Sequence, residues 1–233
     1  MKKTSAAFTL IELLIVITII AVLASIALPA FTGVKERGDQ TKDLSNAKQV
    51  ALALRQFAID NNGSYPAHGP AADYSQASGN PATANDALWW LFPNYLQSEQ
   101  IFAVNGSAYT PANPDNRLDA VGASTRTNTL KAGENSYAYV SGLTDTSSPT
   151  FPLLADGFSS TVGTYATSKP QKGGVWSGKK AVVVLCDASG QLMPVDPTTH
   201  QVLRTDSTGT KVNMFAPASD WLDSTANPIV NPQ

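Results

Sequence analysis

The chain has 233 residues, with 16 lysines and arginines against 18 aspartates and glutamates, which gives a formal net charge of −2. This balance provides no broad basic face, so we predict no nucleic-acid partner. A single cysteine, Cys186, and only two histidines exclude an internal disulfide framework and a cysteine-rich zinc site. The sequence also lacks a zinc-protease motif, a phosphate-binding loop and a nucleophile elbow, and we therefore do not predict an enzyme.

The N-terminal segment is apolar over an unusual length. Lys2, Lys3 and four small residues precede a run of 24 residues from Phe8 to Phe31, which contains a single charged residue. A secretory signal peptide has an apolar region of about 7–15 residues, with the small residues of its cleavage site after it. A helix that spans a bilayer needs about 20 apolar residues. The run therefore predicts a single membrane-spanning helix, and the lysines before it predict a cytoplasmic N-terminus.

Glu12 is the exception within this apolar run. A carboxylate near the centre of a bilayer costs roughly 2.5–3.5 kcal/mol, and such residues usually have a partner charge. An α-amine four residues before Glu12 would exist if the chain were cut between Ala7 and Phe8. Without such a cut, the segment would be an ordinary signal anchor, with Glu12 lying near the lipid headgroups.

The stretch from Ala7 to Phe31 resembles the N-terminal signature of type IV pilins and type II secretion pseudopilins. A short basic leader is followed by Phe-Thr-Leu-Ile-Glu at residues 8–12 and by an aliphatic helix, and Pro29 stands where many members have a helix-kinking proline. One departure is Ala7, since most members have glycine before the cut.

This resemblance implies a processing step and an assembly step. A prepilin peptidase removes residues 1–7 and N-methylates Phe8. Glu12 then neutralises the Phe8 amine of an adjoining subunit as the helices stack in a filament, because either charge alone in an apolar bundle is heavily penalised.

The fold expected from the resemblance and the residue pattern is α+β and pilin-like, with a long N-terminal helix packed on a small antiparallel sheet. Residues 8–31 form the transmembrane and filament-core helix, and residues 32–62 form its amphipathic continuation. A kink or local melting is expected between Pro29 and Gly38. The continuation carries a stripe of apolar residues at spacings of three and four: Leu44, Ala47, Ala51, Leu54 and Ala58.

Residues 63–135 are predicted to be an irregular loop region. The helix should stop at Asn61-Asn62-Gly63, and the turn from Asn61 to Pro66 resembles one found in major pseudopilins. A short helix capped near Asn85 and Asp86 should run to Phe92. Trp89 and Trp90 on this helix are interpreted as packing under the loop, with a subunit or ligand contact for one of them as the alternative.

Residues 136–233 are predicted to contain the sheet. The expected strands are 137–140, 151–155, 181–186 and 191–195, the last two joined as an antiparallel hairpin by the turn at 187–190. Cys186 should be a small buried residue. The tail, which holds Pro217, Trp221, Pro228 and Pro232, is expected to be irregular.

The resemblance implies a structural subunit of a pilus-like filament. The function expected is that of a type II secretion pseudopilin, a homo-oligomer that depends on prepilin peptidase and an inner-membrane assembly platform. It would cross the inner membrane once before assembly and belong to a periplasmic or extracellular filament afterwards. The alternatives are a surface type IV pilin and a membrane-tethered extracytoplasmic binding module that keeps residues 1–7.

Two sequence features concern the choice between a pseudopilin and a type IV pilin, and the presence of a cofactor. Many type IVa pilins close a C-terminal loop with a disulfide, which one cysteine cannot do, and this favours a pseudopilin. Major pseudopilins often bind calcium, and Asp115, Asn116 and Asp119 cluster in the sequence. No spacing matches an EF-hand loop, so we predict no cofactor, with calcium as the alternative and its ligands unassigned.

Overall fold

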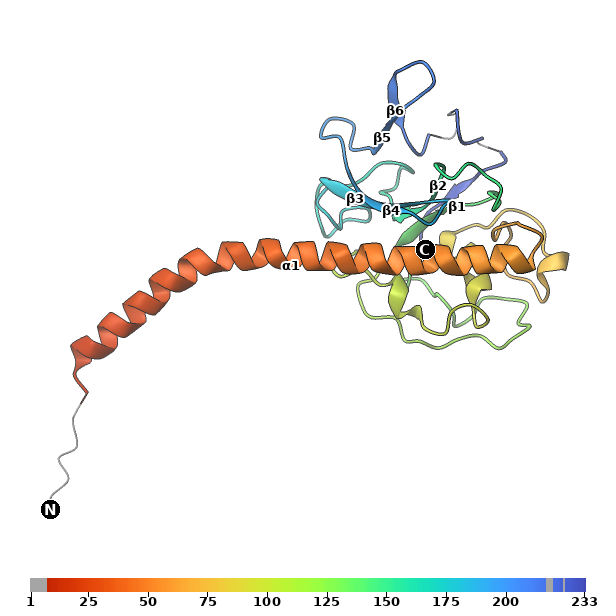
Figure 1. Cartoon of the computed structure of the whole chain (residues 1–233). Coiled ribbons are helices and arrows are strands. Elements are labelled where there is room, and N and C mark those ends of the chain that lie inside the picture. The colour runs from red at the N-terminus through yellow and green to blue at the C-terminus, as the bar shows by residue number, and fades with distance from the viewer. Residues whose placement is uncertain (1–7, 217–219, 224) are drawn as a thin grey trace. The chain divides into compact units, whose positions relative to one another are not determined.

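The computed structural model describes residues 8–216, 220–223 and 225–233, and for Pro29 and Ala30 the backbone only. The chain divides into two compact units, Met1–Thr41 and Lys42–Gln233, which are described separately. The first secondary-structure element, α1, runs from Leu10 to Asp60 without interruption (Figure 1). The predicted long helix is thus confirmed, while the local melting expected between Pro29 and Gly38 is wrong.

In the first unit, α1 is apolar and exposed. Its large apolar side chains between residues 8 and 34 are exposed by 47–81%, and α1 is long and apolar enough to cross a membrane by length and composition. Two hydroxyls of this segment donate to backbone carbonyls of the preceding turn, from Thr18 to Leu14 at 2.7 Å and from Ser25 to Val22 at 2.7 Å. Such bonds satisfy polar groups inside the helix itself, as a lipid environment requires.

In the second unit, α1 packs through one face. The predicted apolar stripe is confirmed, because four of its five residues are at most 2% exposed and Leu44 packs against the same core. The helix ends as expected at Asp60. Asn62 and Gly63 adopt left-handed backbone conformations, with φ of 53° and 80°, and the Gly63 N–H donates to the Ala58 carbonyl at 2.8 Å. This geometry closes the helix in the manner of a glycine C-cap.

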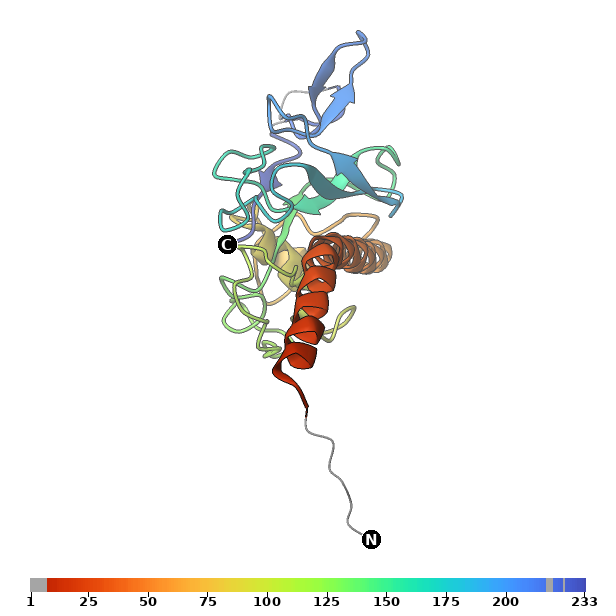
Figure 2. The ribbon, with the colours of Figure 1, turned by 90° about the vertical axis from the view of Figure 1, so that its left-hand side faces the viewer.

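A five-stranded antiparallel sheet covers that face of α1, in the order β4-β3-β2-β1-β7 (Figures 1 and 2). The strands are β1 (Tyr137–Val140), β2 (Pro152–Asp156), β3 (Lys180–Leu185), β4 (Gly190–Pro194) and β7 (Ile229–Val230). Every residue of β1 and β2 is buried. Gly190 marks the close approach of β4 to the helix, because a Cβ there would lie 2.8 Å from the side chains of Leu44 and Lys48.

The C-terminal tail is more ordered than the sequence indicated. The strands β5 (Leu203–Thr205) and β6 (Lys211–Asn213) form a separate hairpin, seen at the top of Figure 1. β7 pairs with β1, with Tyr139 opposite Val230 and Val140 opposite Ile229. The expectation of an irregular tail is therefore wrong for β7, while β5 and β6 lie before Pro217 in a stretch where no strands were predicted.

The loop region contains only short helices. They are η1 (Tyr74–Gln76), α2 (Ala84–Leu88), η2 (Trp89–Leu91) and η3 (Glu99–Phe102). The predicted cap near Asn85 and Asp86 is confirmed in part, since the N-cap residue is Thr83 and Asp86 completes a capping box with it. The Asn85 side chain is buried instead and donates to the Leu130 carbonyl at 2.7 Å.

Two buried carboxyl groups join α1 to the sheet. Asp43 on α1 and Asp156 at the end of β2 are 2% and 1% exposed. The Tyr137 hydroxyl donates to Asp43 at 2.8 Å, while the Trp176 indole N–H and the Val182 N–H donate to Asp156 at 2.9 and 2.8 Å. Burial raises the pKa of Asp156 to about 6, and burial together with the neighbouring Asp156 charge raises the pKa of Asp43 well above its usual value. The sequence pattern did not identify this pair.

Candidate functional site

The start of α1 is built around Thr9 and Glu12. The Glu12 carboxylate accepts hydrogen bonds from the Thr9 backbone N–H at 2.8 Å and from the Thr9 hydroxyl at 2.7 Å, while the Glu12 N–H donates to the Thr9 hydroxyl at 3.3 Å. This reciprocal pattern is a capping box, in which a threonine before the helix and a glutamate three residues later satisfy each other's donors. Glu12 thus has a local role in the single chain that the sequence analysis did not anticipate.

Of the other predicted site residues, Phe8 lies beside this cap. Phe8 is 76% exposed directly before Thr9, and Glu12 is exposed on the first turn of α1. Pro29 lies farther along α1, in a continuous stretch of helix. Ala7 falls outside the described residues. The structure brings Phe8 and Glu12 to the same end of the helix, and it places Pro29 in a separate part of it.

Since α1 begins with a run of exposed apolar side chains, this end of the molecule requires an apolar environment. Exposed apolar patches of such length mark contact with a membrane or with other protein surfaces. The Glu12 carboxylate accepts hydrogen bonds from Thr9, and among the described residues no cation balances its charge.

A second group of acidic side chains lies in the loop region. Glu99, Asp115 and Glu134 each place a carboxylate oxygen within 4.8 Å of the others. Glu99 is fully buried, and its Oε2 atom has no hydrogen-bond partner among the described residues. Burial, with the charges of Glu134 and Asp115, raises the pKa of Glu99 to about 7.

This carboxylate group could hold a hard cation, because carboxylate oxygens are the ligands that calcium prefers. Lys131 already provides one positive charge, since its Nζ lies 2.6 Å from Asp115. Of the three residues clustered in the sequence, only Asp115 belongs to the group. The Asn116 side chain accepts from the Glu99 N–H at 2.8 Å, and Asp119 accepts from the N–H groups of residues 127–129. Glu99 and Glu134 were missed because they lie 16 and more residues from Asp115 in a segment without periodicity.

The two adjacent tryptophans pack as the sequence analysis favoured. Trp89 is 7% exposed and its indole N–H donates to Asp119 at 3.0 Å. Trp90 is half-buried and donates to the His68 carbonyl at 3.1 Å. Cys186 is buried as predicted, and burial raises the pKa of its thiol to about 12, which makes it unreactive at neutral pH.

Comparison with known proteins places the N-terminal segment in a defined group. A protein-family profile described as a prokaryotic N-terminal methylation motif matches residues 2–28. Type II secretion system core protein G of Aeromonas hydrophila is 40% identical over 61 residues, which are 26% of this chain and 43% of that protein. The protein of the same name from Pectobacterium carotovorum is 42% identical over 55 residues, which are 24% of this chain and 35% of that protein.

A type IV pilin is also similar. The type IV major pilin protein PilE1 of Neisseria gonorrhoeae is 36% identical over 78 residues, which are 34% of this chain and 36% of that protein. The matches thus span less than half the length of these curated relatives. No solved structure matches the chain. The chain thus carries the prokaryotic N-terminal methylation motif at residues 2–28, and α1 begins within this motif at Leu10.

Proposed function

We propose that this protein is a type II secretion pseudopilin, a structural and non-catalytic filament subunit that polymerises through α1 to drive protein export. The observation that supports this most is Glu12, a charged residue in the first turn of an otherwise apolar and exposed helix. The helix supplies the apolar surface that stacks in the filament, and Glu12 supplies the charge that fixes the stagger between neighbours.

In this proposal prepilin peptidase cuts between Ala7 and Phe8 and methylates the new amine. Removal of Lys2 and Lys3 lets the start of the helix move into the apolar bundle. There the Glu12 carboxylate exchanges its bonds to Thr9 for the Phe8 amine of an adjoining subunit. Pro29, which has no N–H to donate, leaves one carbonyl of α1 without its helical partner and so makes that part of the helix easier to bend during packing.

The second candidate is a surface type IV pilin, which the similarity to PilE1 supports. Both candidates share the processing and the stacking of α1, and they differ in what the filament does. The similarity to core protein G and the single cysteine favour the pseudopilin.

Deletion of the gene distinguishes the two. We expect the deletion strain to retain its exported proteins in the periplasm and to regain their release when the wild-type gene is restored, while surface pili stay unchanged. The measurement is mass spectrometry of culture supernatant and periplasm together with electron microscopy of whole cells. Loss of surface pili with normal export would assign the protein to the pilins instead.

A further inference from the structure

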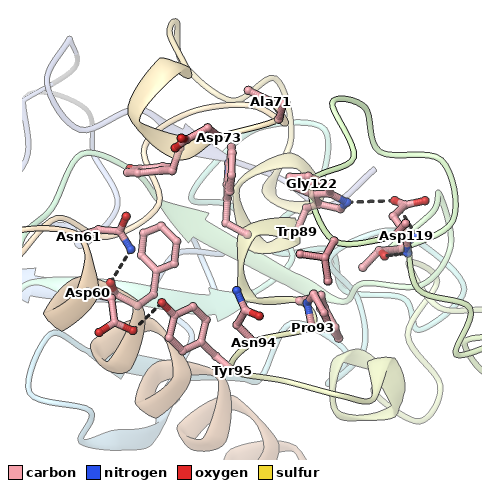
Figure 3. A pocket seen from close by; sticks show the side chains of 18 residues that line it. Asp60, Asn61, Ala71, Asp73, Trp89, Pro93, Asn94, Tyr95, Asp119 and Gly122 are labelled. Carbon is pink, nitrogen blue, oxygen red and sulfur yellow. Dashed lines mark hydrogen bonds between the residues drawn. The ribbon is translucent and has the colours of Figure 1, made fainter.

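A cavity of about 360 Å³ lies in the second unit beside the C-terminal end of α1 (Figure 3). Aromatic rings form much of its wall. They come from the end of α1, from η1, from η2 and from the segment after it: Phe57, Tyr74, Trp89, Trp90 and Tyr95. The sequence analysis singled out the two tryptophans, and the proposed function gives them no role.

The aromatic rings pack against one another edge to face. Tyr74 lies 4.9 Å from Phe57 and 5.0 Å from Trp90, with interplanar angles of 89° and 80°. Trp89 and Trp90 are 5.0 Å apart at 78°. Because both indole N–H groups already donate within the chain, these side chains are fixed in position. The cavity therefore has a preformed aromatic wall.

The charged side chains that line the cavity are all acidic. Its lining residues include Asp60, Asp73 and Asp119 and contain no lysine, arginine or histidine. The Asp119 carboxylate accepts hydrogen bonds from the backbone N–H groups of residues 127–129, whereas Asp60 and Asp73 are exposed. In Figure 3 the latter two lie on the side of the cavity away from Trp89. Since Asp60 and Asp73 line the cavity and are exposed, they form its rim, and a second cavity shares both residues.

Each rim carboxylate keeps acceptor capacity. Asp60 accepts from the Tyr95 hydroxyl through Oδ2 at 2.8 Å. Asp73 caps η1 through Oδ1, which accepts from the Ser75 N–H and hydroxyl at 2.9 Å, and these bonds hold the pKa of Asp73 below its usual value. An ionised carboxylate has about four lone-pair positions, so both can accept further charged donors.

We propose that this cavity binds a cationic side chain, lysine or arginine, of a partner protein. A positive group is attracted to the faces of aromatic rings, most strongly to tryptophan, and its charge is complementary to the carboxylates at the rim. A phosphate or a carboxylate would be repelled by Asp60 and Asp73. A metal ion would lack the shell of oxygen ligands that it needs in a cavity walled by rings.

The indole N–H signals of the full chain test this proposal in solution. The chain has four tryptophans, and Trp176 and Trp221, which donate to Asp156 and to the Met214 carbonyl, serve as internal controls. The protein is kept in a non-ionic polyoxyethylene detergent, because the cationic headgroup of a choline detergent would itself compete. Acetyl-arginine amide is the probe, and acetyl-citrulline amide is its uncharged counterpart. Trp89→Phe and Trp90→Phe assign the signals.

We expect the arginine probe to shift the signals of Trp89 and Trp90 alone, and the citrulline probe to shift none. The double variant Asp60→Asn, Asp73→Asn keeps the hydrogen-bond acceptors and should weaken binding by about fivefold to tenfold, as loss of two exposed ion pairs predicts. Asp187→Asn, which removes an exposed carboxylate from the β3–β4 turn, is the matched control and should change nothing. Methyl glucoside serves as an uncharged sugar probe. Three results would overturn the proposal: equal binding of the arginine and citrulline probes, an unchanged affinity of the double variant, or signal shifts caused by methyl glucoside and not by the arginine probe.

Discussion

A chain with Glu12→Leu is expected to be inserted and cleaved as well as the wild type and to form no filaments. The substitution makes the start of α1 more apolar, so insertion loses nothing. In the filament, however, the Phe8 amine of the adjoining subunit would enter the apolar bundle without a partner. Breaking a buried ion pair by removing one member typically costs about 3–5 kcal/mol, and every added subunit would bear this cost.

The capping box requires a control that separates the two roles of Glu12. Glu12→Gln keeps an acceptor for the Thr9 donors but removes the charge, and we expect an intermediate filament yield. Thr9→Val keeps the charge but removes the hydroxyl of the cap, which should cost the helix start about 1 kcal/mol and leave assembly largely intact. Sedimentation and electron microscopy measure the yield, with cleavage checked by N-terminal sequencing. A wild-type yield from processed Glu12→Leu, or an equal loss in Thr9→Val, would contradict the pairing role.

The stability of the second unit is expected to fall as the pH rises above about 4, because the buried carboxyl groups of Asp43 and Asp156 then have to ionise. Both groups have higher pKa values in the folded than in the unfolded protein, so the folded protein binds more protons between these values. Their contribution to the free energy of unfolding is complete below the usual aspartate pKa. It is lost as the pH rises through their pKa values in the folded protein, and for Asp156 this pKa is about 6. A difference of about two pKa units corresponds to about 3 kcal/mol.

Asp43→Asn tests this directly. The amide can still accept from the Tyr137 hydroxyl and can donate to Asp156 without titrating. We therefore expect the variant to gain stability relative to the wild type as the pH rises through the acidic range, because its stability no longer falls through the titration of Asp43, whose pKa burial raises. Denaturant unfolding of the full chain in non-ionic detergent measures the difference, and Asp187→Asn, an exposed carboxylate on the β3–β4 turn, is the control. If Asp43→Asn and the wild type lose stability in parallel, Asp43 does not contribute to the pH dependence.

The elements that the sequence predicts well are those with strong local patterns. The apolar run at 8–31 and the stripe from Leu44 to Ala58 follow a helical period over many turns. β3 is rich in β-branched residues and is followed by a turn, so its hairpin with β4 was predicted within one residue at each end. In these places local propensity and burial act in the same direction.

The elements that were missed depend on contacts between distant residues. β7 has two residues and exists because β1, almost 90 positions earlier, offers it a free edge. Asp43 lies on a helix whose polar residues are normally solvated, and only the position of Asp156 buries it. Glu99 has a raised pKa because it is buried and because Glu134 and Asp115, which the chain brings close through loops without periodicity, add negative charge. Such features depend on tertiary structure and leave no repeating signal in the sequence.

The mass and N-terminal sequence of the native protein test the central claim most directly, because both the pilin-like assembly and the role of Glu12 require a free amine at Phe8. Protein purified from membranes or filaments should lack residues 1–7 and begin with N-methylated phenylalanine at position 8. A mature protein that begins at Met1 or Lys2 would contradict the account, since the uncut leader would leave Glu12 without its partner and two lysines where apolar helices must stack.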